Sequence, residues 1–179
     1  IVFNGNGYAE EWPEEAAKRG LLNLKSMIEA AATLTTDKAV ALFERFGIFT
    51  KVELESRAEI IYETYAKTIN IEALTMIDMA GKKIIPAVMK YSKNLADTVN
   101  AVKAAGADAF AQADILKSVC EKLSAMQTAL KKLEKVEAEA GAMKDAKEQA
   151  FFYKDVVREV MQELRDPADE LEMIVDKDI

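Results

Sequence analysis

Histidine is absent from the 179 residues, and this absence removes several classes of site. Without an imidazole there is no Ser-His or Cys-His nucleophile, no histidine-ligated zinc site, and no Glu-x-x-His pair of the kind that di-iron bundles use. Cys120 is the one cysteine, so an internal disulfide and a four-thiolate metal site are excluded as well. Its apolar neighbours at helical spacing predict a small core side chain without chemistry of its own. The low cysteine content is typical of a cytoplasmic protein.

A basic block and a long uncharged apolar run are also missing. The net charge is −7, from 24 Lys and Arg against 31 Asp and Glu, and both signs alternate along the chain. Because phosphate binding requires a positive footprint, we expect no nucleic-acid partner. The most apolar long window, residues 69–89, contains Glu72, Asp78, Lys82 and Lys83, whose burial in a bilayer is costly. We therefore expect no membrane partner.

Helix breakers are few, with three prolines and seven glycines, and they mark the expected joints. Gly20 and Gly47 are positioned to end helices, and Thr50 with Glu53 matches a capping box that starts a helix at about Lys51. No alternating strand pattern extends beyond Ile1 to Phe3, which could end a strand or loop of a preceding body. We expect helices over residues 8–19, 21–32, 37–46, about 51–105, about 108–140, with Gly141 as terminator, and a last one carrying residues 153–175.

Three of these helices carry narrow apolar seams. A 55-residue helix would be about 80 Å long at about 1.5 Å per residue. We expect it to bend at Pro86, with Gly81 softening the helix or admitting a neighbour, and we expect a further kink at Pro167. The predicted seams are Leu74, Ile77, Gly81, Ile84, Val88, Tyr91 and Leu95; Leu116, Val119, Leu123, Met126, Leu130, Leu133 and Val136; and Tyr153, Val157, Val160, Leu164, Ala168, Leu171 and Val175.

Charges flanking narrow seams are typical of an up-and-down bundle. The predicted fold is all-α: an elongated antiparallel helical bundle with one very long, kinked helix and short N-terminal helices. We expect residues 1–50 to form an adaptor of short helices and loops, and residues 51–179 to form the long-helix bundle. Together they make a single structural unit.

Four features of the sequence are candidates for a site. Glu72 and Asp78 lie six residues apart, about 120° out of alignment on a helix, and predict solvated or salt-bridged faces. The NGNGY turn with Gly5 and Gly7 lacks the remainder of a phosphate-binding motif, so it predicts a tight turn into the first helix. The aromatic run 151–153 predicts core, with part of it free to contact a partner, and Trp12 predicts an anchor against the bundle or a parent body. We assign no catalytic, cofactor-binding or metal-binding residue.

Several blocks of the sequence, in order, resemble the C-terminal part of type III glutamine synthetases. The chain departs from that family's pattern at Ala9, Pro13 and Pro167, and residues 101–105 and 107–114 fit poorly. The start at Ile1 rather than Met, and the end at Ile179, suggest a piece of a longer protein. The matching blocks are FNGNGYAEEW (3–12), KRGLLNLK (18–25), ALFERFGIFT (41–50), KTINIEALTMIDMA (67–80), IIPAVMKY (84–91), YKDVV (153–157), ELR (163–165) and ADELE (168–172).

The resemblance implies a parent enzyme that makes glutamine from glutamate and ammonia with ATP, through a γ-glutamyl phosphate and with Mg²⁺ or Mn²⁺. The family's nucleotide, metal and glutamate ligands belong to preceding regions, so none is transferred to this chain. The family assembles as ring-based homo-oligomers. The implied partners are therefore the catalytic domain of the same polypeptide and neighbouring subunits.

Two other hypotheses stay open at this point. The chain could be a free-standing helical adaptor or scaffold that binds a partner helix in a groove. A metal-binding bundle enzyme is the third hypothesis, which the absence of histidine disfavours. The reading frame upstream of Ile1 separates the first two hypotheses, and metal analysis tests the third.

Overall fold

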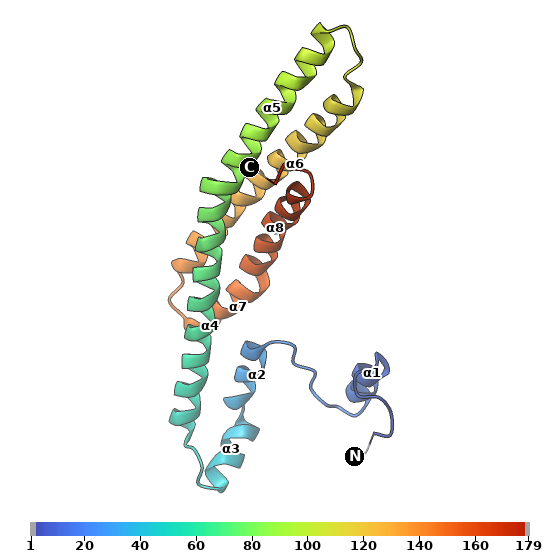
Figure 1. The fold of residues 1–179 in the computed structure, drawn as a ribbon. Helices are drawn as coiled ribbons and strands as arrows, with labels where there is room; N and C mark the ends of the chain where they lie inside the picture. The colour runs from blue at the N-terminus through green and yellow to red at the C-terminus, as the bar shows by residue number, and fades with distance from the viewer. Residues whose placement is uncertain (1–2, 178–179) are drawn as a thin grey trace. The chain divides into compact units, whose positions relative to one another are not determined.

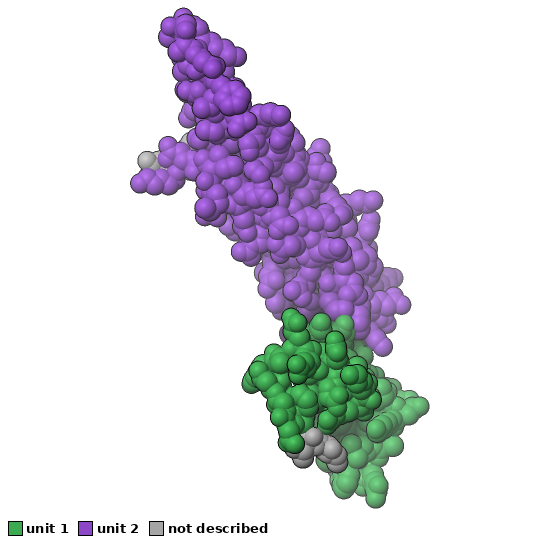
Figure 2. All heavy atoms as spheres, turned by 90° about the vertical axis from the view of Figure 1, so that its right-hand side faces the viewer, with its two compact units in different colours: residues 1–62 green, residues 63–179 purple. Residues whose placement is uncertain are grey.

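The computed structural model describes residues 3–177, and every regular element in that range is helical. Ile1 and Val2, where a strand end was considered, lie outside the described residues. Contacts divide the chain into Ile1–Tyr62 (unit 1) and Glu63–Ile179 (unit 2), which Figure 2 colours separately. The predicted all-α class is confirmed. The expected division of roles between residues 1–50 and 51–179 stays a prediction.

Unit 1 contains α1 (Glu11–Lys18), α2 (Met27–Leu34), α3 (Asp37–Arg45) and the start of α4 (Lys51–Met79). A capping box at Ser26 and Glu29 begins α2, so this helix starts later than the predicted 21–32. The predicted capping box at Thr50 is confirmed, because the Thr50 N–H donates to Glu53 Oε2 at 2.7 Å and the Glu53 N–H donates to Thr50 Oγ1 at 3.4 Å. The buried apolar side chains of the unit are Ala16, Ile28, Ala31, Leu54, Ala58 and Tyr62.

Gly47 closes α3 in the left-handed region, with φ of +62°. Its N–H donates to Glu44 O at 3.0 Å and the Ile48 N–H donates to Phe43 O at 3.0 Å, the pair of bonds that defines a Schellman motif. A side chain is rarely tolerated at this φ, so the glycine predicted as the helix terminator is required there.

Unit 2 is a bundle in which α6 (Phe110–Gly141) packs against α5 (Ile85–Ala104) on one side and α8 (Arg158–Glu172) on the other. Figure 1 shows α6 running antiparallel to both neighbours. A short helix, α7 (Ala146–Phe152), leads into α8. It is capped by Asp145, whose carboxylate accepts the Glu148 N–H at 2.8 Å. The sequence pattern did not predict that the last helical segment begins at Ala146, because its apolar seam begins only at Tyr153. Gly141 lies inside α6, whose C-cap is Ala142, and so is not itself the terminator.

A π-helical turn, η1 (Ala80–Ile84), joins α4 to α5 directly before Pro86. Proline lacks an N–H and crowds the carbonyl of the preceding turn, and the Ile85 N–H instead donates to Ala80 O, five residues back. The helical path from Lys51 to Ala104 is thereby continuous. The π-helical turn lies next to Pro86, the residue at which a bend was predicted. A second π-helical turn, η2 (Tyr153–Val157), joins α7 to α8, and Pro167 lies within α8.

The π-helical turn corrects the predicted seam of the long helix. Leu74 is 46% exposed and Gly81 is exposed, whereas Ala73 and Ala80 are buried. A π-helical turn adds one residue, so the buried positions Ala80 and Val88 are eight residues apart instead of seven. The predicted seam is therefore right after the turn. Leu74 before it and Gly81 within it are one residue out of phase, whereas Ile77 is partly buried and packs against the core. A Cβ at Gly81 would lie 3.8 Å from the Leu130 side chain, an ordinary van der Waals distance, so the approach of this neighbour does not require a glycine.

The predicted seams of α6 and of the last helix are confirmed. Leu133, Met126 and Val119 on α6 are fully buried, as are Val157 and Tyr153 on η2. The buried core of unit 2 consists of Ala66, Ile69, Ala73, Ala80, Ile85, Val88, Val119, Met126, Ala129, Leu130, Leu133, Val136, Ala140, Tyr153, Val157, Val160, Leu164 and Leu171.

Candidate functional site

The most developed polar cluster of unit 2 joins three helical segments. Asn70 on α4 donates from Nδ2 to Glu137 Oε1 on α6 at 2.7 Å and to Tyr153 Oη on η2 at 2.9 Å. Tyr153 is 1% exposed, and Asn70 and Glu137 are half-buried. The amide therefore satisfies a buried phenol oxygen and orients a carboxylate at the edge of the core.

Each member of this polar cluster lies beside a buried seam position. Asn70 follows Ile69, Glu137 follows Val136, and Tyr153 is the first residue of η2. Ala66 and Ala73, about one turn on either side of Asn70, are small buried side chains of the same core cluster as Tyr153. The packing of three seams thus sets the geometry of the cluster.

Burial raises the pKa of Tyr153, the hydrogen bond from Asn70 opposes that shift, and the negative charge of Glu137 adds to it. The phenol consequently holds its proton at neutral pH. The cluster presents one neutral amide, one neutral phenol and one carboxylate, an arrangement that suits structural hydrogen bonding better than proton transfer.

A recess of roughly 460 Å³ adjoins the cluster. On its rim the Lys67 ammonium pairs with Glu63 at 2.6 Å, and at its far side Gln149 Nε2 donates to Ala140 O at 3.0 Å, which ties α7 to the end of α6. The polar groups on the wall are thus already engaged within the chain. The lining residues are Ala66, Lys67, Asn70, Ile71, Gly141, Gln149 and Tyr153.

We expect Asn70→Ala to lower the free energy of unfolding by about 1–3 kcal/mol, because it leaves the buried Tyr153 oxygen without its donor. Combining it with Tyr153→Phe should cost less than the sum of the two single changes, with a coupling of about 0.5–3 kcal/mol. Urea unfolding followed by circular dichroism measures both quantities. Asn100→Ala, on the exposed face of α5, is the matched control and should change stability by less than about 0.5 kcal/mol. Additive effects at Asn70 and Tyr153 would contradict the predicted coupling.

A loss of stability at alkaline pH follows from the raised pKa of Tyr153. The folded state holds the phenolic proton more tightly than the unfolded chain, whose tyrosines titrate near pH 10. The stabilisation is therefore fully present below about pH 10 and is lost as pH rises through the higher pKa of the folded state. Unfolding free energies measured from pH 8 to 11 should fall less steeply in Tyr153→Phe than in the parent chain. Identical slopes would count against a buried neutral phenol.

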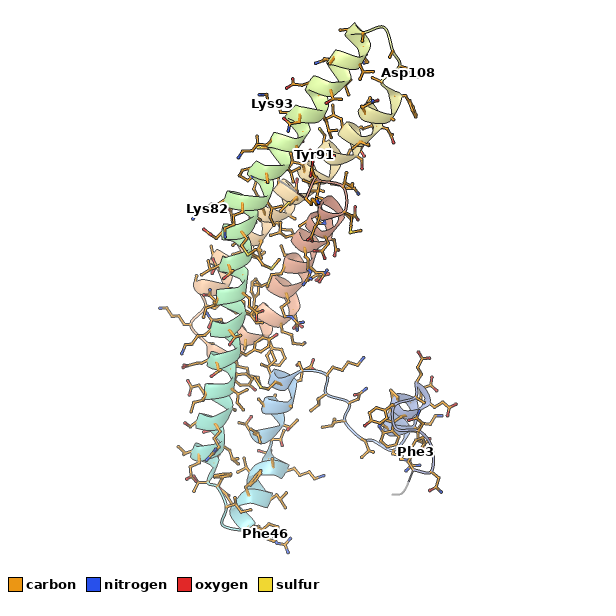
Figure 3. All side chains as sticks on the ribbon, viewed as in Figure 1. Phe3, Phe46, Lys82, Tyr91, Lys93 and Asp108 are labelled. Atoms are coloured by element: carbon orange, nitrogen blue, oxygen red, sulfur yellow. The ribbon has the colours of Figure 1, made fainter. Side chains whose placement is uncertain are left out.

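The carboxylates weighed from the sequence remain apart. Glu72 and Asp78 are both exposed on α4. The Lys82 ammonium donates to Asp78, and this hydrogen bond holds the pKa of Asp78 below its usual value. The predicted solvated and salt-bridged faces are confirmed. Figure 3 labels Lys82, which lies on η1, on the outer side of the helical path.

Cys120 was predicted to be a small core side chain, and this prediction is wrong, because Cys120 is exposed. The α6 seam passes through Val119 and Leu123, and Cys120, one residue beyond Val119, is turned by about 100° onto the outer face. Among the residues that the structure describes, no side-chain hydrogen bond or ion pair assigns Cys120 a functional role.

The remaining features behave mostly as predicted. The tight turn before α1 is present, since the Tyr8 N–H donates to Asn6 Oδ1 at 3.0 Å, and a Cβ at Gly5 would overlap the Phe3 ring. Trp12 is half-buried and packs on Phe3, with ring centroids 4.7 Å apart, and its expected role as an anchor against the bundle or a parent body stays a prediction. In the aromatic run, Tyr153 is core and Phe152 packs against it.

Within residues 3–177, no three His, Cys, Asp or Glu side chains gather closely enough to hold a metal ion. Over the same range, none of the helices has the length and apolar character needed to cross a bilayer.

The Asn70, Glu137 and Tyr153 contacts were missed at the sequence level. Their members are 67 and 83 residues apart in the chain, so no local motif joins them. The available signal was an amide beside the apolar Ile69 on the predicted 51–105 helix, which predicts a polar partner from another helix without identifying it.

The fold and this cluster define an α-helical bundle domain in which the polar groups that meet between helices serve packing. The family described as the glutamine synthetase C-terminal domain matches residues 1–103, more than half of the chain. The chain belongs to this family, and the resemblance to type III glutamine synthetases is confirmed.

Three relatives support the assignment. A glutamine synthetase of Butyrivibrio fibrisolvens is 41% identical over 177 residues, covering 98% of this chain and 25% of the relative. A type-3 glutamine synthetase of Dictyostelium discoideum is 43% identical over 102 residues, 57% of this chain and 14% of the relative. A glutamine synthetase of Bacteroides fragilis is 30% identical over 185 residues, 100% of this chain and 25% of the relative. The chain thus spans about a quarter of the length of two of these relatives.

Proposed function

We propose that this chain is the non-catalytic structural and assembly domain of a glutamine synthetase. In this proposal the parent is a cytoplasmic, ATP-dependent glutamate–ammonia ligase of nitrogen assimilation. One observation carries the proposal. Nearly the whole chain aligns with about a quarter of the length of each of two enzymes named glutamine synthetase. A domain that accompanies a much longer polypeptide fits this relation better than a free-standing adaptor.

The use of side chains within unit 2 supports a structural role. Most of its buried apolar residues form one continuous core across α4, α5, α6, η2 and α8. Lysines pair with carboxylates on the outside, both along single helices and between α6 and α8, where Lys132 Nζ lies 2.7 Å from Glu163 and Lys122 pairs with Glu170. These pairs orient neighbouring helices, and exposed pairs of this kind contribute little individually.

The parent's ATP and its Mg²⁺ or Mn²⁺ are assigned to the remainder of the polypeptide. Hard divalent cations require several oxygen ligands converging on one point, and the carboxylates described above diverge along helix faces. We therefore assign no nucleotide, metal or glutamate ligand to residues 3–177. The domain's partners are the catalytic portion of the same chain and, through it, other subunits of a homo-oligomer.

Two measurements test the proposal. The isolated chain should form no glutamine from ATP, glutamate and ammonia with either metal, whereas the full-length enzyme should. Deleting this domain from the full-length enzyme should lower the fraction of assembled oligomer on size-exclusion chromatography with light scattering. Turnover by the isolated chain, or normal assembly of the deletion variant, would overturn the proposal.

A further inference from the structure

The turn between α3 and α4 presents four large apolar side chains to solvent within eleven residues. Leu42, Phe46, Ile48 and Val52, here termed the apolar knob, are 53%, 66%, 56% and 72% exposed. Figure 3 shows Phe46 at this turn, its ring directed away from the helices of unit 1. Exposed apolar side chains that gather in this way mark interaction sites more often than singly scattered ones do.

The backbone under the apolar knob is fixed by hydrogen bonds. The Schellman motif at Gly47 ends α3, the capping box at Thr50 begins α4, and the Lys51 N–H donates to Glu44 Oε1 at 3.3 Å across the turn. Few backbone groups of the turn remain to be ordered by a partner. A surface that is already rigid loses little conformational entropy when it binds.

Two half-buried aromatic side chains of the same turn pack together and brace it. The rings of Phe43 and Phe49 lie 5.7 Å apart, and the Arg57 guanidinium lies 4.2 Å from the Phe49 centroid. The turn thus divides its apolar residues into an inner pair that stabilises the loop and the outer four of the knob. Aromatic side chains, phenylalanine among them, are enriched at the cores of interfaces, and the exposed Phe46 is positioned to fill such a place.

The distribution of exposed apolar residues identifies unit 1 as the docking unit. Among residues 3–177, ten of the seventeen large exposed apolar side chains lie in unit 1, although it holds 62 of the 179 residues. About three quarters of the length of the two longest-matching relatives falls outside the match, and the family is described as a C-terminal domain. The portion of polypeptide available to cover unit 1 is therefore the one that precedes it.

We infer that the apolar knob docks on the preceding portion of the same polypeptide, with Phe46 as its central anchor. This inference rests on the proposed function and adds to it the surface through which the domain is held. The exposed charges of Glu44, Arg45 and Lys51 alternate with the members of the knob, and the Arg45 guanidinium lies 5.9 Å from the Phe46 ring centroid. An apolar centre with a charged rim is the anatomy expected of a protein–protein interface.

Photo-crosslinking in the full-length enzyme tests the inference. Phe46→p-benzoylphenylalanine is prepared in an equal mixture of ¹⁴N- and ¹⁵N-labelled subunits that have been assembled together, and crosslinked peptides are identified by mass spectrometry. We expect crosslinks to a peptide that precedes this domain, with both halves carrying the same isotope. Phe110→p-benzoylphenylalanine, at a phenylalanine of unit 2 that is 75% exposed, is the matched control and should give few such crosslinks.

A second variant keeps the inference testable if crosslinking is inefficient. In the full-length enzyme, Phe46→Ser should raise the hydrogen-exchange rate of the contacted peptide by about tenfold or more, and Phe110→Ser should not. Isotopically mixed crosslinks, which indicate a second copy, would overturn the inference, as would a crosslink to another protein or unchanged exchange in Phe46→Ser. If deletion of the domain disrupts assembly while Phe46 makes no contact, the docking surface is wrong and the proposed function stands. If deletion leaves assembly intact, the proposed function itself fails.

Discussion

Cutting the chain after residue 103, where the family match ends, should abolish cooperative unfolding of the long-helix bundle. The truncation removes α6, α7 and α8 and leaves the buried side chains of α4 and α5, such as Ile85, Val88 and Val99, without the helices that cover them. An isolated helix is stabilised mainly by packing of its apolar face, so the remaining rod should fray. Circular dichroism at 222 nm with a urea titration should show a broad, non-sigmoidal transition.

Removal of residues 1–20 from the other end is the control for this truncation. The core of unit 2 contains no residue from that segment, so the unfolding transition of the bundle should survive with a similar midpoint. A sigmoidal transition in the 1–103 fragment, with the midpoint of the whole chain, would show that α5 needs no cover from α6. In that event the folding unit would end where the family match ends.

Helix boundaries were largely predictable because they depend on residues close in the chain. Gly20 and Gly47 end helices in the left-handed region, and Thr50 with Glu53 starts α4 through a local capping box. The cap at Asp145 depends on an equally local bond to the Glu148 N–H, yet it was missed, because the prediction relied on the apolar seam, which starts at Tyr153.

The buried face of the long helix and the polar contacts between helices were harder to predict, because both depend on distant parts of the chain. Periodicity alone continued the Val88 seam back through Leu74, whereas the π-helical turn before Pro86 shifts the buried face by one residue to Ala73. Whether a helix accommodates a proline by kinking or by a π-helical turn depends on what packs around it. The bond from Asn70 to Tyr153 requires three helices to be in register, and only the assembled bundle provides that.

Leu133→Ala should destabilise the chain by about 2–5 kcal/mol, the second large effect that we expect. Leu133 lies in the middle of α6, is 0% exposed, and belongs to the core shared with α5 and α8. Truncating it removes apolar burial and leaves a cavity that helices packed on both sides cannot easily close. Equilibrium urea unfolding gives the change directly, and an unchanged m-value would show that the loss arises in the folded state.

Leu74→Ala is the matched control, and it also decides the phase of the long helix. If Leu74 were a seam residue, as periodicity predicts, its truncation would cost about as much as that of Leu133. Because it is 46% exposed, we expect a change below about 1 kcal/mol. Ala73→Leu should instead cost about 1–3 kcal/mol, since the added atoms must enter a closely packed seam at a residue that is 0% exposed. The reverse order, with Leu74→Ala costly and Ala73→Leu neutral, would place the seam one residue later and remove the phase shift assigned to the π-helical turn.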